Sequence, residues 1–260
     1  MNSPASIVFI TGTFFGNNCW DEWCCYFESK GYTCMAPAWP HKEASPEELR
    51  NRHPDESIAS NRLASLIDHY ANIIYRFPRK PILIGHSLGG LIVQLLVQRG
   101  LAAAGVAVHS FPPQNARRLN FVFLKTCWEA MGFFNAVNKT YMPSFRKWKL
   151  DFANGMTGDE QKDLFYQYCI PESKLVFRDC FTSISKIDFN HPHAPLLFTA
   201  GTRDEVAPAV LNHNNYKKYH PGNSITDYKE FEGHNHLVFD GPACTAETDF
   251  ILYWLQGIHK

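Results

Sequence analysis

The sequence predicts an α/β protein built around a mostly parallel sheet. Short apolar runs rich in β-branched residues recur along the chain, and segments with a helical spacing of apolar residues separate them. This alternation is typical of βαβ units, because parallel strands are joined by crossover connections that usually contain a helix. Six runs are expected to be strands: Ser6–Ile10, Tyr32–Ala36, Pro81–Ile84, Gly105–His109, Pro195–Ala200 and Ile225–Phe231.

The first third of the chain carries several helix signals. Cys19 to Lys30 is expected to be helical. Ser45, Pro46 and Glu48 form a capping-box pattern: a serine precedes the helix, proline takes its first position, and a glutamate follows three residues after the cap. A longer amphipathic helix is expected from about Ser57 to Arg76. Its apolar positions follow helical spacing: Leu63, Leu66, Ile67, Tyr70 and Ile74.

The same alternation continues toward the C-terminus. The third strand passes through Gly85-His86-Ser87-Leu88-Gly89-Gly90 into a helix from Leu91 to Gln98. Further helices are expected from Val206 to Tyr219 and from Glu247 to His259.

One long segment interrupts the strand pattern. Residues 111–190 contain 11 of the 20 phenylalanines of the chain and no strand-like run. Because a structureless loop of that length is uncommon in a compact domain, we expect a helical insertion. The segment is either a second small core or an apolar lid over a pocket, and its place in the chain favours the lid. The predicted organisation is a core of residues 1–110 and 191–260, with residues 111–190 inserted as a helical lid.

Composition excludes several classes of protein. Lys plus Arg and Asp plus Glu both total 25, so nothing favours nucleic acid or an anionic membrane as the main partner. No apolar stretch approaches the roughly 18 residues that span a bilayer. The eight cysteines are scattered, and the N-terminus shows no signal-peptide pattern, so we expect reduced thiols and a cytoplasmic protein.

Gly85-His86-Ser87-Leu88-Gly89 matches the pattern G-x-S-x-G. The motif lies between an apolar strand and a helix, which is where a nucleophilic serine can be held on a tight turn. Glycines at positions 85 and 89 would remove collisions with neighbouring elements. The alternatives are an ordinary glycine-rich turn or a phosphate-binding loop, but the Walker lysine and the G-x-G-x-x-G spacing are missing.

A serine nucleophile needs a base and a group that orients the base. Asp204 follows the strand Pro195–Ala200 and would lie at the same sheet edge as Ser87, with Glu205 as its competitor. After the last strand, either His234 or His236 could be the base.

Acyl transfer also needs hydrogen-bond donors for the oxyanion. The N–H of Leu88, at the start of the helix after Ser87, is the first candidate, and the N–H of Thr13 (or of Phe14) after the first strand is the second. That loop could equally be a simple connection. No metal-binding pattern is present, and we expect neither a metal nor a cofactor.

Together these motifs resemble the α/β-hydrolase superfamily, and in particular small bacterial-type serine hydrolases with a helical lid. The resemblance rests on the Thr11-Gly12-Thr13 loop, the Gly85–Gly90 turn, Gly201-x-x-Asp204 and Gly233-x-x-His236, and it spans nearly the whole chain. It implies about six parallel strands with helices on both faces, and it favours Asp204 over Glu205 and His236 over His234. Thr11 departs from the His-Gly that many members carry there.

The resemblance implies a serine hydrolase that cleaves a neutral, fairly apolar ester, lactone or thioester through an acyl-enzyme. The expected partner is a small apolar molecule, with no nucleic acid and no membrane insertion. Two alternatives use the same fold. The protein could be an acyltransferase or cyclase with the same triad, or a ligand-binding protein without catalysis.

Overall fold

The computed structural model describes residues 5–116, 127–133, 136–220, 222 and 224–258. Its centre is a sheet of six parallel strands in the order β2-β1-β3-β4-β5-β6. The strands are β1 (Ser6–Ile10), β2 (Thr33–Met35), β3 (Ile82–His86), β4 (Ala104–Val108), β5 (Leu196–Gly201) and β6 (Thr226–Phe231). The order reverses between β1 and β3, and ligands of open α/β sheets bind beyond the carboxyl ends of strands at such a point.

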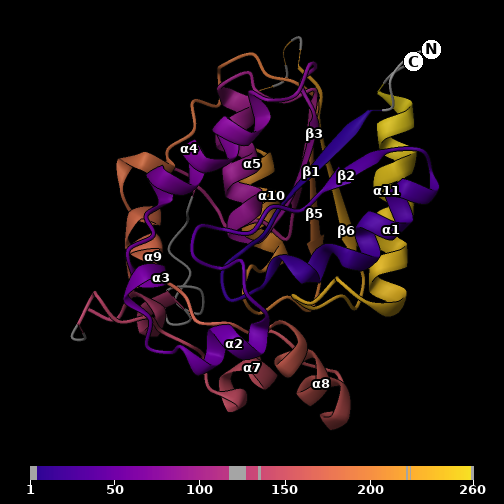
Figure 1. Ribbon diagram of the computed structural model, residues 1–260. Coiled ribbons are helices and arrows are strands. Elements are labelled where there is room, and N and C mark those ends of the chain that lie inside the picture. Colours follow the sequence, from indigo (N-terminus) through magenta and orange to yellow (C-terminus); the bar gives the residue numbers. More distant parts are fainter. Residues whose placement is uncertain (1–4, 117–126, 134–135, 221, 223, 259–260) are drawn as a thin grey trace.

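Helices cover both faces of the sheet and one of its ends (Figure 1). Helices α1 (Asp21–Ser29) and α11 (Gly241–Gly257) pack together on one face. On the other face lie α4 (Leu63–Ile74), α5 (Leu88–Gln98) and α10 (Ala209–Tyr216). The strands β1, β3, β4 and β5 are buried almost throughout, because both of their faces are covered.

The sequence pattern predicted all six strands with ends within two residues of those observed. The capping signal at Ser45 is confirmed in part: the Ser45 hydroxyl accepts from the Glu48 amide at 3.2 Å, and α2 (Pro46–Asn51) follows. The closing helix was expected too late, since α11 already begins at Gly241 with a proline in its first turn. His259, where that helix was expected to end, lies outside the described residues.

The single helix expected from Ser57 to Arg76 is wrong, because it is interrupted between α3 (Glu56–Ala59) and α4. The interruption is stabilised by contacts from far along the chain. The Ser173 hydroxyl contacts the carbonyl oxygens of Ala59 and Asn61 at 2.9 and 2.8 Å. Asp179 accepts from the Leu63 amide at 3.1 Å. These partners replace the intrahelical bonds that a continuous helix would make.

The helix expected from Val206 to Tyr219 is shorter than predicted. The amides of Val206 and Ala207 donate to the Asp204 carboxylate instead of beginning a helix, and α10 starts only after Pro208.

The described part of residues 111–190 includes the helices α7 (Phe145–Asp151), α8 (Gly158–Tyr168) and α9 (Lys174–Cys180). Figure 1 shows them, together with α2 and α3, gathered away from the two faces of the sheet. Residues 117–126 and 134–135 of this segment lie outside the described residues. No helix in the described part of the chain has the length and apolarity needed to cross a membrane.

The start of α5 packs against the end of β1 with no room for a side chain. A Cβ atom added to Gly89 would lie 2.0 Å from the Ile10 carbonyl oxygen, which is backbone and cannot turn away. We therefore expect Gly89→Ala to lower the free energy of unfolding by roughly 3 kcal/mol, measured by urea denaturation. Gly158→Ala is the matched control, because nothing lies within 4 Å of the Cβ position there. Equal stability of the two variants would contradict this packing.

Candidate active site

Ser87 occupies a strained turn between β3 and α5. Its backbone has φ 55° and ψ −120°, a conformation that residues other than glycine rarely adopt. The turn is held from neighbouring elements: the Ser87 amide donates to Val108 at 2.9 Å, and the Ser87 carbonyl accepts from Phe111 at 2.9 Å. The hydroxyl group is thereby presented at the carboxyl end of β3.

Two of the predicted glycine roles are confirmed by the packing around this turn. A Cβ atom at Gly85 would lie 2.3 Å from the Gly89 carbonyl oxygen, and Gly89 is closed off by β1 as described above. Gly12, in the loop after β1, also lies against this turn. A Cβ atom there would lie 2.7 Å from Cβ of Ser87, so Gly12 lets the loop after β1 approach the serine.

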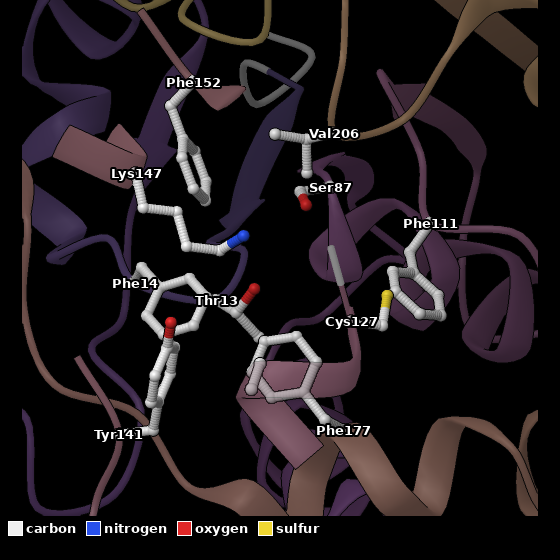
Figure 2. A pocket seen from close by; sticks show the side chains of 11 residues that line it. Thr13, Phe14, Ser87, Phe111, Cys127, Tyr141, Lys147, Phe152, Phe177 and Val206 are labelled. Atoms are coloured by element: carbon white, nitrogen blue, oxygen red, sulfur yellow. The ribbon is translucent and has the colours of Figure 1, made fainter. Parts of the chain in front are cut away.

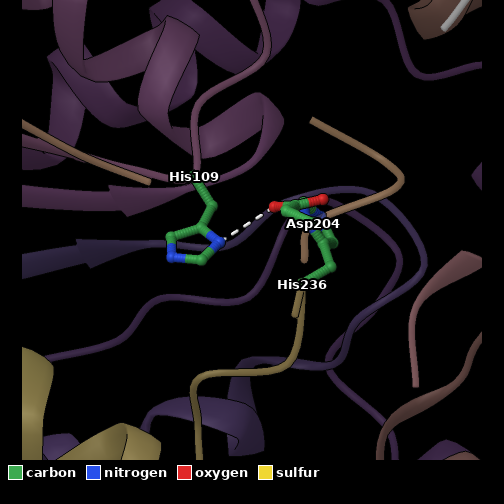
Figure 3. A group of neighbouring side chains, drawn as sticks. All are labelled: His109, Asp204 and His236. Atoms are coloured by element: carbon green, nitrogen blue, oxygen red, sulfur yellow. Dashed lines mark hydrogen bonds and ion pairs between the residues drawn. The ribbon is translucent and has the colours of Figure 1, made fainter. Parts of the chain in front are cut away.

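Asp204 and His236 meet at the same edge of the sheet, as Figure 3 shows. Nδ1 of His236 lies 2.7 Å from Oδ2 of Asp204, and both side chains are fully buried. The other carboxylate oxygen accepts from the amides of Val206 and Ala207 at 2.8 and 2.7 Å. Burial alone would raise the pKa of Asp204, but the imidazoles of His236 and His109 outweigh it and hold that pKa well below its usual range. Asp204 is therefore an ionised acceptor.

The other nitrogen of His236 is left as a base. An ionised carboxylate only accepts hydrogen bonds, so Nδ1 of His236 carries the proton and Nε2 has a lone pair. Nε2 is buried and has no hydrogen-bond partner among the described residues. Its ring packs 4.4 Å, centroid to centroid, from that of His86, the residue before Ser87. The Ser87 hydroxyl does not reach Nε2 in this structure, and such bonds are often long before substrate binds.

His86 contributes to the orientation of His236. Nε2 of His86 lies 2.9 Å from the His236 carbonyl oxygen, which requires the proton on that nitrogen. Burial holds the pKa of His86 well below its usual value, and the neighbouring imidazoles of His236 and His109 lower it further. His86 is thus a neutral donor that ties the turn at Ser87 to the loop carrying His236.

The competing residues lie elsewhere. His234 stacks on Phe231, and its Nδ1 is 3.5 Å from a Glu247 oxygen rather than near Asp204. The Glu205 side chain is exposed to solvent. Of the two pairs of alternatives, the structure brings together Asp204 and His236.

A second histidine and a glutamate, which belong to none of the sequence motifs, extend this network. Nδ1 of His109 lies 2.9 Å from the same Asp204 oxygen that contacts His236. Nε2 of His109 lies 3.0 Å from Oε1 of Glu247 on α11, and both side chains are fully buried. The sequence held one signal for His109, because this histidine ends a predicted buried strand at the sheet edge where Ser87 was expected. Glu247 could not be placed in the site without knowing how α11 packs.

The two predicted oxyanion donors flank Ser87. Leu88 is the first residue of α5, and Thr13 lies in the loop after β1. Among the described residues, neither the Thr13 nor the Leu88 amide has a backbone or side-chain acceptor. The alternative donor, the amide of Phe14, is directed to Glu172 at 3.4 Å. This difference favours Thr13 over Phe14.

Glu172 belongs to the inserted segment, so its contact with the Phe14 amide connects this loop to that segment. The Glu172 carboxylate also forms a buried ion pair with Lys42. Both side chains are at most 2% exposed, and the Lys42 ammonium also lies over the Trp39 ring. The backbone around Phe14 is bonded to the same segment, because the Phe14 carbonyl accepts from Ile170 at 2.9 Å. The insertion therefore fixes the conformation of the loop that carries Thr13.

A pocket opens next to Ser87 (Figure 2). It measures about 390 Å³ with its open mouth included, and most of its lining is apolar or aromatic. Much of the lining comes from residues 111–190, including Phe111, Phe152 and Phe177. Figure 2 shows the Lys147 ammonium directed into this space. That charge is balanced by Asp151, whose carboxylate lies 2.7 Å away.

His109, Asp204 and His236 are also the described residues whose ligand atoms lie close enough together to suggest a metal site, all within 4.8 Å. Both imidazoles direct Nδ1 at one oxygen, at 2.7 and 2.9 Å. These distances are hydrogen bonds that leave no space for an ion between the atoms. The geometry indicates a hydrogen-bonded network.

Several solved structures share this fold over nearly the whole chain. A monoacylglycerol lipase from Paleococcus ferrophilus is 18% identical with a TM-score of 0.69, covering 97% of this chain and 95% of that chain. A methylesterase from Arabidopsis is 12% identical with a TM-score of 0.65, covering 97% and 99%. A pyrethroid hydrolase from Sphingobium faniae JZ-2 is 16% identical with a TM-score of 0.64, covering 96% of both chains. No curated protein matches the sequence.

The sequence itself matches a family model. The match to the alpha/beta hydrolase family runs over residues 7–246 and so includes every strand of the sheet and the positions of Ser87, Asp204 and His236. The chain belongs to the alpha/beta hydrolase family.

Proposed function

We propose that the protein is a serine hydrolase that cleaves a neutral, fairly apolar carboxylic ester. The observation that carries the proposal is the buried, unpartnered Nε2 of His236. Asp204 holds the ring through Nδ1, at the sheet edge where the strained turn presents Ser87. Phe152 contacts the His236 ring and lines the pocket together with Ser87, so the base lies directly behind the pocket wall. The distant structural neighbours include esterases and a lipase, which supports an ester as substrate.

The reaction follows from these roles. Ser87 Oγ attacks the ester carbonyl while Nε2 of His236 takes its proton, and Asp204 stabilises the imidazolium that forms. The amides of Thr13 and Leu88 donate to the oxyanion, each contributing about 3 kcal/mol to lowering the barrier. The imidazolium then protonates the leaving alcohol. Water, deprotonated by His236, attacks the acyl-enzyme and releases the acid.

Residues 111–190 act as the lid of this site in the proposal. They supply most of the aromatic wall of the pocket and hold the oxyanion loop through Glu172. Apolar walls select mainly by size and shape. The substrate is therefore expected to be a small molecule with an apolar acyl or alcohol group.

The two histidines after β6 provide a matched test of the triad. We expect Ser87→Ala and His236→Gln each to lower kcat/KM for p-nitrophenyl esters by a factor of roughly 10⁴ or more, because nucleophile and base act as one unit. His234→Gln should retain most of the activity, since the His234 ring lies outside contact with Asp204.

A fluorophosphonate probe should label the wild type and not Ser87→Ala. Wild-type turnover by Ser87→Ala, or loss of activity only in His234→Gln, would overturn the assignment. Absence of both turnover and labelling in folded wild type would favour a ligand-binding protein.

Lys147 offers a test of where the apolar group binds. Replacing Lys147 with methionine removes the ammonium and should make the pocket more apolar. Each substrate methylene buried there contributes about 0.8 kcal/mol to binding. We expect Lys147→Met to lower KM for octanoyl esters roughly threefold or more while leaving acetyl esters unchanged. Arg146→Met, on the same helix and exposed, is the control. Equal effects of Lys147→Met on both chain lengths would place the apolar group elsewhere.

A further inference from the structure

The buried network at Asp204 contains one more charge than the triad needs. His109 lies between two carboxylates, with Nδ1 at 2.9 Å from Asp204 and Nε2 at 3.0 Å from Glu247. All three side chains are fully buried, so water cannot mediate either contact. A neutral imidazole has only one N–H and could donate to only one of two ionised carboxylates. The other contact would then set a nitrogen lone pair against an anion.

We propose that His109 is a permanently charged imidazolium, clamped between Asp204 and Glu247, and that it is a positioning residue that holds the Asp204 carboxylate against His236. The inference rests on the proposed role of His236 as the base. It adds a residue pair that controls the base without touching substrate.

The electrostatics of the site support the charge on His109. Burial alone would lower its pKa, but the hydrogen bonds with Asp204 and Glu247 raise the pKa to about 9. Burial alone would raise the pKa of Glu247, and the contact with His109 brings it below its usual value instead. Because the pKa of His109 lies near 9, the charge is present throughout the neutral range and is lost only in alkali.

The effect on His236 follows from the contacts around Asp204. The rings of His109 and His236 lie 6.3 Å apart and share one carboxylate oxygen of Asp204. Glu247 contacts the other ring nitrogen of His109 from the one that contacts Asp204, and so holds that ring in place. The charged contact with His109 therefore fixes the carboxylate oxygen that also accepts from Nδ1 of His236.

The remaining charged and titratable groups around the two rings do not replace this effect. His86 packs on both rings but is neutral, for the reasons given above. His234 approaches only Glu247, at 3.5 Å. Lys147, in the pocket, is balanced by Asp151. Among the described residues, His109 is the second imidazole that contacts Asp204, at 2.9 Å.

The charge itself can be observed in the resting protein by ¹⁵N–¹H spectroscopy of histidine-labelled enzyme. We expect His109 to show directly bonded protons on both ring nitrogens up to at least pH 8, and His236 to show one, on Nδ1. His109→Asn identifies the signals by their loss. A single ring N–H on His109 at pH 7 would mean that Glu247 carries the proton instead, and would overturn the proposal.

The consequence for the base is tested with His109→Asn, whose amide nitrogen replaces Nδ1 as donor to Asp204 without a charge. We expect kcat for p-nitrophenyl esters to fall roughly tenfold while KM changes little, because a neutral amide holds the carboxylate more weakly than an imidazolium does. His109→Asn combined with Glu247→Gln should show the same loss if the single variant folds poorly, and His193→Asn, far from the site, should show none. An unchanged kcat would contradict the proposal.

The two proposals fail separately. The NMR measurement uses the protein without substrate. A doubly protonated His109 in a protein that cleaves no ester would remove the proposed function and leave the charge assignment. Ester cleavage with a neutral His109 would do the reverse.

Discussion

The site depends on how closely three backbone segments approach one another where β1, β3 and α5 meet. Gly12, Gly85 and Gly89 each lie where a single methyl group would overlap neighbouring atoms, at 2.7, 2.3 and 2.0 Å. Without these contacts, the turn could not hold Ser87 in its strained conformation, because strain persists only where the surroundings over-determine it. The position of the hydroxyl, of the Leu88 amide and of the loop carrying Thr13 all follow from this one packing constraint.

Much of the fold could be predicted from local patterns, since buried parallel strands have a strong signature. All six strands and the turn at Ser87 were identified this way. The errors have a common physical cause. The break between α3 and α4 and the late start of α10 are produced by side chains that satisfy backbone groups, and Ser173 and Asp179 act from more than 100 residues away. Helical periodicity carries no information about such partners.

The residues of the candidate site likewise fall into those that the sequence predicts and those that it does not. Ser87, Asp204 and His236 follow recognisable motifs at the ends of strands, and the structure brings Asp204 and His236 into contact. His109 and Glu247 belong to no short motif. Their role depends on the packing of α11, which brings Glu247 to His109 after β4, and only the three-dimensional arrangement reveals it. Lys147 likewise resembles any surface lysine of an amphipathic helix until its ammonium is found pointing into the pocket.

The buried contact between Lys42 and Glu172 has a consequence for how such an enzyme could change its specificity. Glu172 belongs to the segment that shapes the pocket, Lys42 belongs to the core, and between them they hold the backbone at Phe14. Exchanging the whole segment for one from a relative would bury Lys42 without a counter-charge, at a cost of several kcal/mol. New substrate preferences are therefore reached more easily by replacing single wall residues than by recombining entire segments.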